Sequence, residues 1–233
     1  DLKEGYGVYH YENGDEYAGY WLNNKRHGKG TFTHRDPKSG YTFEGEYLHN
    51  EKLEGKQVYV DGSSYEGTYQ ADKKNGYGKY TYPDGITCYI GDWVANEQHG
   101  HGVFTYLSGS RYEGQFQNNQ MHGTGVYRAS NGDVFQGSFL NDMKHGDDCV
   151  YTFKDGDSYQ GSYRLDLKEG QGRYQFVNGD MYEGEWQKDQ RSGTGRFVFA
   201  KQGGKYEGQF NRGQFQGKGT LKYPNGAIYE GSF

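Results

Sequence analysis

The stretch YEGEWQKDQRSGTGRF, residues 182–197, decides the fold. Tyr182 and Trp186 flank one glycine, and after a polar run a Gly-x-Gly pair at 193–195 precedes another aromatic residue. Aromatic and glycine residues alternate here with polar residues at a period of two. A period of two is typical of a β-strand, because successive side chains of a strand point to opposite faces.

The same aromatic-x-Gly-x-aromatic pattern recurs ten times, with 22 to 26 residues between successive leading aromatics. Such a period indicates a repeat architecture. The ten triplets are Tyr17-Gly19-Trp21, Phe43-Gly45-Tyr47, Tyr65-Gly67-Tyr69, Tyr89-Gly91-Trp93, Tyr112-Gly114-Phe116, Phe135-Gly137-Phe139, Tyr159-Gly161-Tyr163, Tyr182-Gly184-Trp186, Tyr206-Gly208-Phe210 and Tyr229-Gly231-Phe233.

A Gly-x-Gly pair precedes eight of the triplets, whereas the third and seventh repeats have Gln57 and Asp148 where the second glycine is expected. One continuous array is therefore predicted over 1–233. Its ten repeats span 5–21, 28–47, 55–69, 76–93, 100–116, 123–139, 146–163, 170–186, 193–210 and 217–233.

Each repeat is predicted to be a β-hairpin, because its two period-two segments flank a turn sequence such as ENG, PDG, SNG or KDG. In residues 100–116 the turn is centred on Gly109. The predicted cross-strand pairs are Tyr106 with Tyr112, Phe104 with Gly114, and Gly102 with Phe116.

This pairing places an aromatic ring against each glycine, where the missing side chain leaves room for the ring. Gly184 is expected to accommodate a ring from the preceding strand, and Gly195 to lie beside Phe210. The predicted structural glycines are Gly19, Gly45, Gly67, Gly91, Gly114, Gly137, Gly161, Gly184, Gly208 and Gly231.

The composition requires an aromatic core. Leu, Ile, Val and Phe number 35 of 233 residues, while Tyr, Phe and Trp make up 18%. A low aliphatic content is typical of disorder, but disorder also needs a high net charge and few aromatics. Because a lone hairpin is marginally stable, the hairpins are expected to stack. The predicted fold is all-β, an elongated single-layer array of stacked antiparallel hairpins that forms a twisted ribbon with little or no helix.

Three local departures from the repeat are predicted to change the structure. Cys149 occupies the place of a second glycine when positions are counted back from the turn, so a β-bulge is expected there. The fourth repeat has an extra residue after its turn, which places Cys88 before Tyr89. The second repeat has a longer tip at 34–40, which is either a contact loop or a tolerated insertion.

Catalytic and cofactor sites are not predicted. Gly-x-Gly pairs lack the helix and Lys-Ser/Thr of a phosphate loop, and no nucleophile stands at triad spacing. The acids at the x positions are expected on a solvated face, so they do not suggest a glycosidase pair. Weak zinc candidates are His27, His99, His101, His122 and His145.

Charge and cysteine content exclude several partner classes. The net charge is −5 without long blocks of one sign, so no nucleic-acid partner is predicted. Two cysteines give no disulfide framework, and no apolar run is long enough for a membrane span. We expect free thiols in a reducing cytoplasm.

The pattern resembles the MORN repeat (membrane occupation and recognition nexus). The residues that carry the resemblance are Tyr182-Glu-Gly-Glu-Trp186, Gly193-Thr-Gly195 and the His-Gly variants at Lys25–Gly28 and Met143–Gly146. The resemblance covers all ten repeats. Proteins of this family include radial-spoke components of cilia, cytoskeletal scaffolds of protists, junctional membrane proteins and lipid kinases. The resemblance implies that any chemistry would belong to a separate domain.

The expected function is a non-catalytic scaffold that binds proteins in a cytoskeletal or ciliary assembly, without cofactor or small-molecule substrate. Unpaired terminal strands make self-association plausible. The second aromatics are predicted to line a partner groove. These are Trp21, Tyr47, Tyr69, Trp93, Phe116, Phe139, Tyr163, Trp186 and Phe210.

Three alternatives stay open. A membrane tether for anionic phospholipids is disfavoured by the acidic middle of the chain but supported by the basic residues of its last third. A choline-binding carbohydrate module would need two neighbouring Trp per repeat, and the chain has three Trp in all. The array could also be the targeting part of an enzyme. Because DLKEGYG at 1–7 echoes DLKEGQG at 166–172, a fragment of a longer array is expected.

Overall fold

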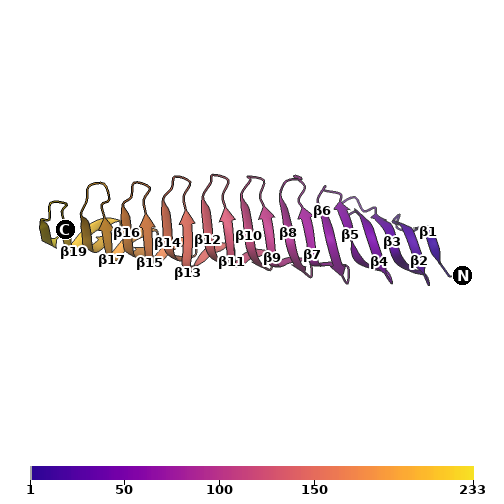
Figure 1. The fold of residues 1–233 in the computed structure, drawn as a ribbon. Helices are drawn as coiled ribbons and strands as arrows, with labels where there is room; N and C mark the ends of the chain where they lie inside the picture. The colour runs from indigo at the N-terminus through magenta and orange to yellow at the C-terminus, as the bar shows by residue number, and fades with distance from the viewer. Residues whose placement is uncertain (1) are drawn as a thin grey trace. The chain divides into compact units, whose positions relative to one another are not determined.

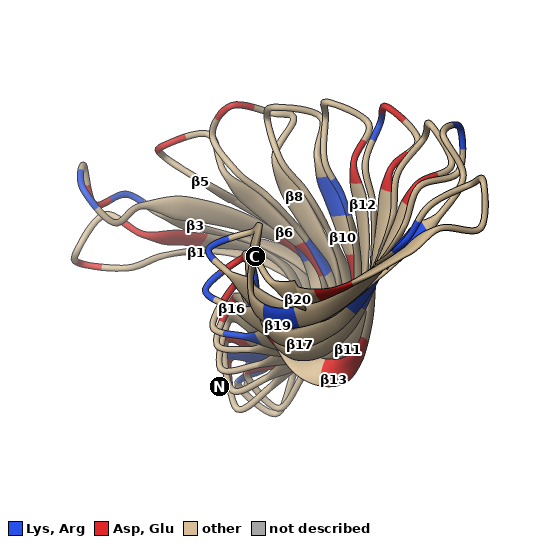
Figure 2. Cartoon of the chain, turned by 90° about the vertical axis from the view of Figure 1, so that its left-hand side faces the viewer, with Lys and Arg blue, Asp and Glu red and all other residues tan. Residues whose placement is uncertain are grey.

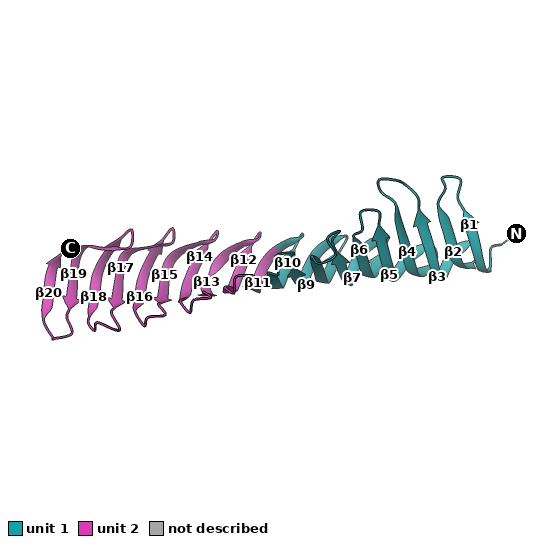
Figure 3. Ribbon diagram, turned by 90° about the horizontal axis from the view of Figure 1, so that it is seen from above, with its two compact units in different colours: residues 1–120 teal, residues 121–233 magenta. Residues whose placement is uncertain are grey.

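The computed structural model describes residues 2–233, and every regular element in this range is a β-strand. The chain divides into two compact units, residues 1–120 and 121–233 (Figure 3). Within each unit every strand pairs antiparallel with the strand that follows it in the sequence, so each unit is a single-layer meander (Figure 1). The all-β prediction is confirmed.

Unit 1 contains ten complete strands. They are β1 (Gly5–His10), β2 (Glu16–Leu22), β3 (Lys25–His34), β4 (Tyr41–Leu48), β5 (Glu51–Tyr59), β6 (Ser64–Gln70), β7 (Lys73–Thr81), β8 (Cys88–Val94), β9 (Glu97–Thr105) and β10 (Arg111–Gln117).

Unit 2 begins within β11 and contains the remaining strands. They are β11 (Gln120–Arg128), β12 (Val134–Leu140), β13 (Met143–Thr152), β14 (Ser158–Arg164), β15 (Leu167–Gln175), β16 (Met181–Gln187), β17 (Gln190–Val198), β18 (Lys205–Asn211), β19 (Gln214–Lys222) and β20 (Ile228–Ser232).

The predicted register of the hairpins is wrong by two residues. In β9 and β10, Tyr112 pairs with Phe104 and Gly114 pairs with Gly102. The physical reason lies in the turn. The Tyr106 N–H donates to the Ser110 carbonyl, so the loop holds three residues and Gly109 is its last residue, with φ of 85°. A three-residue loop with glycine in this left-handed position is a common hairpin connection, and its centre lies one residue before the glycine.

The connections between repeats are tight turns that the sequence analysis did not predict. At 23–24, both Asn23 and Asn24 have positive φ, 50° and 65°, and Leu22 pairs directly with Lys25. Two successive residues with positive φ define a type I′ hairpin turn. Such turns recur at 49–50, 71–72, 95–96, 118–119, 141–142, 165–166 and 188–189. In each unit they form the margin opposite the wide loops (Figure 1).

In seven of the eight tight turns the second residue clamps its repeat to the one before it. Its backbone N–H donates to a carbonyl about one repeat earlier, and its side-chain oxygen accepts the N–H of that same earlier residue. Asn and Asp suit this position because they tolerate left-handed φ and carry a short acceptor. The seven clamps join Asn24 to Lys3, Asn50 to Arg26, Asn96 to Lys74, Asn119 to Gln98, Asp142 to Met121, Asp166 to Lys144, and Asp189 to Lys168.

The two glycines of each Gly-x-Gly have different structural roles. The first lies at an irregularity in the strand ladder, as Gly193 does, with φ of 57° opposite the break between Gly184 and Trp186. Left-handed φ at a bulge favours glycine. The second glycine, such as Gly195, pairs with another glycine and lies beneath a ring.

Rings do cover the glycines, but the ring comes from a different residue than predicted. A Cβ on Gly184 would lie 2.5 Å from the Gly195 Cα, and a Cβ on Gly195 would lie 2.7 Å from the Tyr182 ring. Tyr182 therefore covers both glycines from the strand of Gly184 itself, whereas a ring from the preceding strand and a contact with Phe210 were expected. The leading aromatic of the same strand is a close neighbour of the following predicted structural glycines: Gly19, Gly45, Gly67, Gly91, Gly137, Gly161, Gly184, Gly208 and Gly231.

The departures in the third and seventh repeats have clear outcomes. Cys149 pairs with Gly161 across a register break, which confirms the predicted bulge and its place in a second-glycine position. In the third repeat Gly55, not Gln57, is the second glycine, because Gly55 pairs with Gly45 beneath the ring of Phe43. This repeat is one residue shorter at the bulge, and Gln57 stands where other repeats carry a ring.

Candidate partner-binding surface

One face of each unit is built from aromatic rings. The leading aromatics are its deepest layer, and Tyr182 is fully buried. Its hydroxyl donates to the Glu185 carbonyl at 2.7 Å, and Tyr17 bonds to the Tyr20 carbonyl at 3.0 Å in the same way. These carbonyls lie opposite the bulges, where the ladder is irregular. The hydroxyl thus provides a partner for a backbone group, and burial without such a partner would be costly.

The second aromatics, predicted to line a groove, are packed into this layer. Their exposed fractions are between 1% and 8%. The Trp93 Nε1–H donates to the Gly78 carbonyl at 3.1 Å, and Trp186 bonds to Gly172 at 3.0 Å. In the free chain these rings are buried, so they are not accessible to a partner without rearrangement. A partner-binding role for them stays a prediction. They are Trp21, Tyr47, Tyr69, Trp93, Phe116, Phe139, Tyr163, Trp186 and Phe210.

The accessible rings belong to a third set, which we name the outer ring strip. Its members stand two or four residues after the second glycine, toward the wide loops, and are half-buried or exposed. In unit 1 they are Tyr9, Tyr11, Phe32, Tyr59, Tyr80, Tyr82, Phe104 and Tyr106; in unit 2 they are Tyr127, Tyr151, Phe153, Tyr174, Phe176 and Phe199.

Rings of the outer strip contact one another from repeat to repeat. In unit 2 the centroids of Tyr151 and Phe153 are 4.5 Å apart, and Phe153 lies 5.8 Å from Tyr174. Tyr174 and Phe176 are again 4.5 Å apart. Period-two alternation had placed these residues on the aromatic face. The sequence did not distinguish them from the buried rings. Their exposure depends on how far each ring lies from the paired glycines, where the leading aromatic packs.

A row of cations lies over rings of the aromatic face, two residues after six of the eight tight turns. We name it the cation row; it consists of Arg26, Lys52 and Lys74 in unit 1 and Lys144, Lys168 and Arg191 in unit 2. The Lys168 Nζ is 5.2 to 5.3 Å from four ring centroids, a distance at which cation–π attraction operates.

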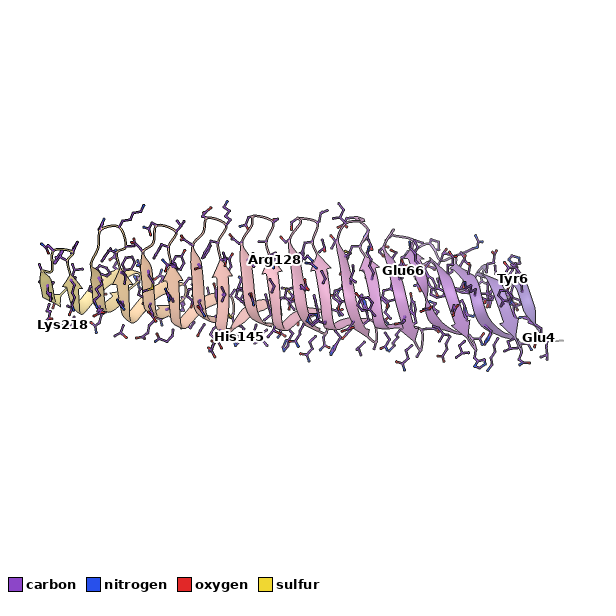
Figure 4. The ribbon with its side chains drawn as sticks, in the orientation of Figure 1. Glu4, Tyr6, Glu66, Arg128, His145 and Lys218 are labelled. Carbon is purple, nitrogen blue, oxygen red and sulfur yellow. The ribbon has the colours of Figure 1, made fainter. Side chains whose placement is uncertain are left out.

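The opposite face of each sheet is polar, and its charges alternate across the strands. In unit 1 Glu44, Lys56, Glu66 and Lys79 face one another in successive strand pairs. Glu66 lies on this face of β6 (Figure 4), and acidic and basic residues are interspersed along the ribbon (Figure 2). Opposite charges directly across a strand pair stabilise the sheet. The outward position of these acids was predicted.

The zinc candidates do not converge. No group of three His, Cys, Asp or Glu side chains within residues 2–233 is arranged to hold a metal. His27 has its closest ring neighbour in His49, at 5.7 Å, while His145 lies at the tight-turn margin of β13 (Figure 4). The other candidates are His99, His101 and His122.

Both cysteines are free. Cys149 is 1% exposed, and burial raises the pKa of its thiol, which makes the reactive thiolate less available.

Comparison with known sequences agrees with this architecture. The MORN repeat profile matches residues 1–16, 17–36, 65–87, 89–111, 112–134, 135–146, 159–181, 182–204 and 206–228. The chain belongs to the MORN-repeat family. The two long unmatched segments, 37–64 and 147–158, contain the shortened bulge of the third repeat with Gln57 and the bulge with Cys149.

A curated relative is MORN repeat-containing protein 3 of Xenopus laevis, which is 55% identical to this chain over 40 residues. The match covers 17% of this chain and 16% of that protein. MORN repeats are generally non-catalytic and are consistent with binding of proteins or membranes. In residues 2–233 no helix has the length and apolar character to cross a bilayer.

Proposed function

We propose that this MORN-repeat chain is a non-catalytic scaffold that binds other proteins through the outer ring strip, within a cytoskeletal or ciliary assembly in the cytoplasm. The observation that supports the proposal is the strip itself. Rings such as Phe153 and Phe176 are accessible, contiguous and held in a backbone frame whose spacing the clamps fix. Accessible aromatic rows are typical of protein interfaces.

Protein binding is favoured over a membrane tether by the distribution of charge. Unit 1 contains 12 basic and 17 acidic residues, and its polar face alternates in sign. Attraction to anionic lipid grows with each basic residue near the surface, and acidic residues there oppose it. Unit 2 carries 14 residues of each sign, so neither unit has a basic excess.

Affinity purification with crosslinking from ciliated cells tests the proposal. The full chain is compared with the double variant Phe153→Thr and Phe176→Thr, which keeps strand propensity but removes two outer rings. A control variant replaces Tyr20 and Tyr77, which are exposed on the polar face, by Thr. We expect cytoskeletal or axonemal proteins to crosslink to the wild type and to the control, and to be lost with the ring variant.

Two results would contradict the proposal. One is an identical set of crosslinked proteins from the wild type and the ring variant. The other is flotation of the chain with phosphatidylserine liposomes at moderate salt without protein neighbours, which would favour the membrane tether.

A further inference from the structure

The third repeat contains a cavity on the aromatic face that its neighbours fill with a ring. At the position of Gln57, the second and fourth repeats carry Phe32 and Tyr80. The smaller side chain leaves a space of about 320 Å³ beside Lys52 and Lys74. That volume lies at the lower end of the range of ligand sites.

Positive charge at this cavity exceeds negative charge. Arg26, Lys52 and Lys74 line it, and Asp72 is the sole carboxylate among the lining residues of the described chain. None of the ion pairs formed within residues 2–233 involves either lysine. Lys52 is only 7% exposed, and its ammonium donates one hydrogen bond, of 2.8 Å, to the Gln57 Oε1.

A buried hydroxyl at the same cavity also lacks a partner. Tyr69 is 8% exposed and lines the space, and its hydroxyl has no hydrogen-bond partner among residues 2–233. The Lys52 Nζ lies 5.5 Å from the centroid of the Tyr69 ring. Buried polar groups are normally hydrogen-bonded, so an unpaired donor in a cavity that two lysines line indicates an acceptor that the described chain does not supply.

Burial has already weakened the charged form of both lysines. Desolvation lowers the pKa of Lys52 and of Lys74 to about 8, and for Lys52 this effect exceeds the opposing attraction of Asp72. An anion placed between them would favour the charged form and raise both pKa values. The ring surroundings give the lysines cation–π contacts, at 4.5 Å from Tyr41 and 4.4 Å from Tyr80, and Asp72 is the one acidic residue that lines the cavity beside them in the described chain.

We propose that this cavity binds the carboxylate of an acidic residue that an apolar segment of a partner protein presents to the aromatic face. Lys52 and Lys74 contact the carboxylate, the Tyr69 hydroxyl donates to it, and the outer rings hold its apolar neighbours. A protein carboxylate fits better than a lipid headgroup, because a single acidic side chain can enter the cavity while the net negative charge of unit 1 opposes an anionic bilayer. The inference rests on the proposed scaffold function and names the chemistry of one of its contacts.

Lysine NMR with model peptides tests the site in the full chain. The probes are acetyl-leucyl-glutamyl-leucine amide and its glutamine analogue, and the signals are the side-chain ε-methylenes of Lys52 and Lys74. We expect the glutamate peptide to shift both signals and raise both pKa values, while the glutamine peptide leaves them unchanged. Lys56, on the polar face, is an internal control.

Variants make the test specific. Tyr69→Phe should weaken peptide binding about tenfold, as expected for one hydrogen bond to a charged group. Gln57→Phe should abolish binding, because it completes the ring row and closes the cavity. Circular dichroism checks that each variant keeps its strands.

The proposal is overturned if both peptides shift the lysine signals equally, if neither does so at millimolar concentration, or if only phosphatidylserine vesicles do so. Its failure can be told apart from failure of the scaffold function. If the variant with Gln57→Phe still crosslinks the same proteins as the wild type, the scaffold stands and this site alone is rejected.

Discussion

At the scale of the residue, the structure depends on a contact that recurs in the repeats, in which the leading aromatic ring lies over two paired glycines. Tyr182 lies across Gly184 of its own strand and Gly195 of the next, and its hydroxyl reaches the Glu185 carbonyl. Any side chain at these glycines would occupy the volume of the ring or of the facing backbone. Interiors are close-packed, so small additions of volume are costly there.

Gly195→Ala should lower the free energy of unfolding by about 1–3 kcal/mol, because the added methyl group meets the Tyr182 ring at 2.7 Å. Gly7→Ala is the matched control. Gly7 holds the same place in the first repeat, but its nearest neighbour is the Trp21 side chain at 3.7 Å, an ordinary contact. Urea denaturation of both variants measures the difference. Equal midpoints for the two variants would contradict the ring-crossing account.

At the scale of the element, the tight turns matter as much as the strands. Each turn closes one hairpin and is also bonded to the repeat before it, as Asn119 is to Gln98. The clamp accounts for the constant spacing on this margin, whereas the wide loops absorb the extra residues of 34–40 and of the fourth repeat.

Asn119→Ala should cost about 1–2 kcal/mol, because the Gln98 N–H loses its acceptor and a non-glycine residue remains at φ of 67°. Asn118→Ala is the control for the backbone effect alone. It also has positive φ, 51°, and its side chain forms no hydrogen bond in the described structure. Thermal unfolding followed by circular dichroism should show the larger loss for Asn119. A larger loss for Asn118 would assign the effect to turn propensity instead.

At the scale of the whole molecule, the core is phenolic rather than aliphatic. Burial raises the pKa of Tyr17, Tyr59 and Tyr151 to about 12. In the unfolded chain these hydroxyls ionise near pH 10. The folded state therefore holds protons that the unfolded state releases, and the associated stability is present below pH 10 and lost as the pH rises toward 12.

We expect cooperative unfolding in this alkaline range, with phenolate absorbance rising together with loss of the strand signal in circular dichroism. Lys52 and Lys74 act in the opposite direction, because their lowered pKa values make stability rise between about pH 8 and 10, before the tyrosine contribution is lost. Phenolate absorbance that rises fully near pH 10 while the strand signal persists would show that the tyrosines are not protected by folding.

Much of the fold could be predicted from the sequence because the repeat displays its alternation ten times. Strand identity, the aromatic face and the bulge at Cys149 followed from period and spacing. The register did not, since the loop is centred one residue before Gly109. The candidate surface was harder still. Trp186 and Phe153 have the same alternation, and only packing shows that the first is buried and the second accessible.

The clamps give the array a direction. In seven of the eight tight turns the second residue, an Asn or Asp, bonds back toward the amino terminus, as Asp189 does to Lys168. Each of these turns therefore docks on groups of the repeat that precedes it in the sequence. A growing polypeptide could thus assemble in the order in which it is synthesised, each new hairpin finding its docking groups already in place. Shuffling or duplicating such modules by recombination would preserve the joints wherever both clamp bonds are present, because the complementary atoms recur from copy to copy.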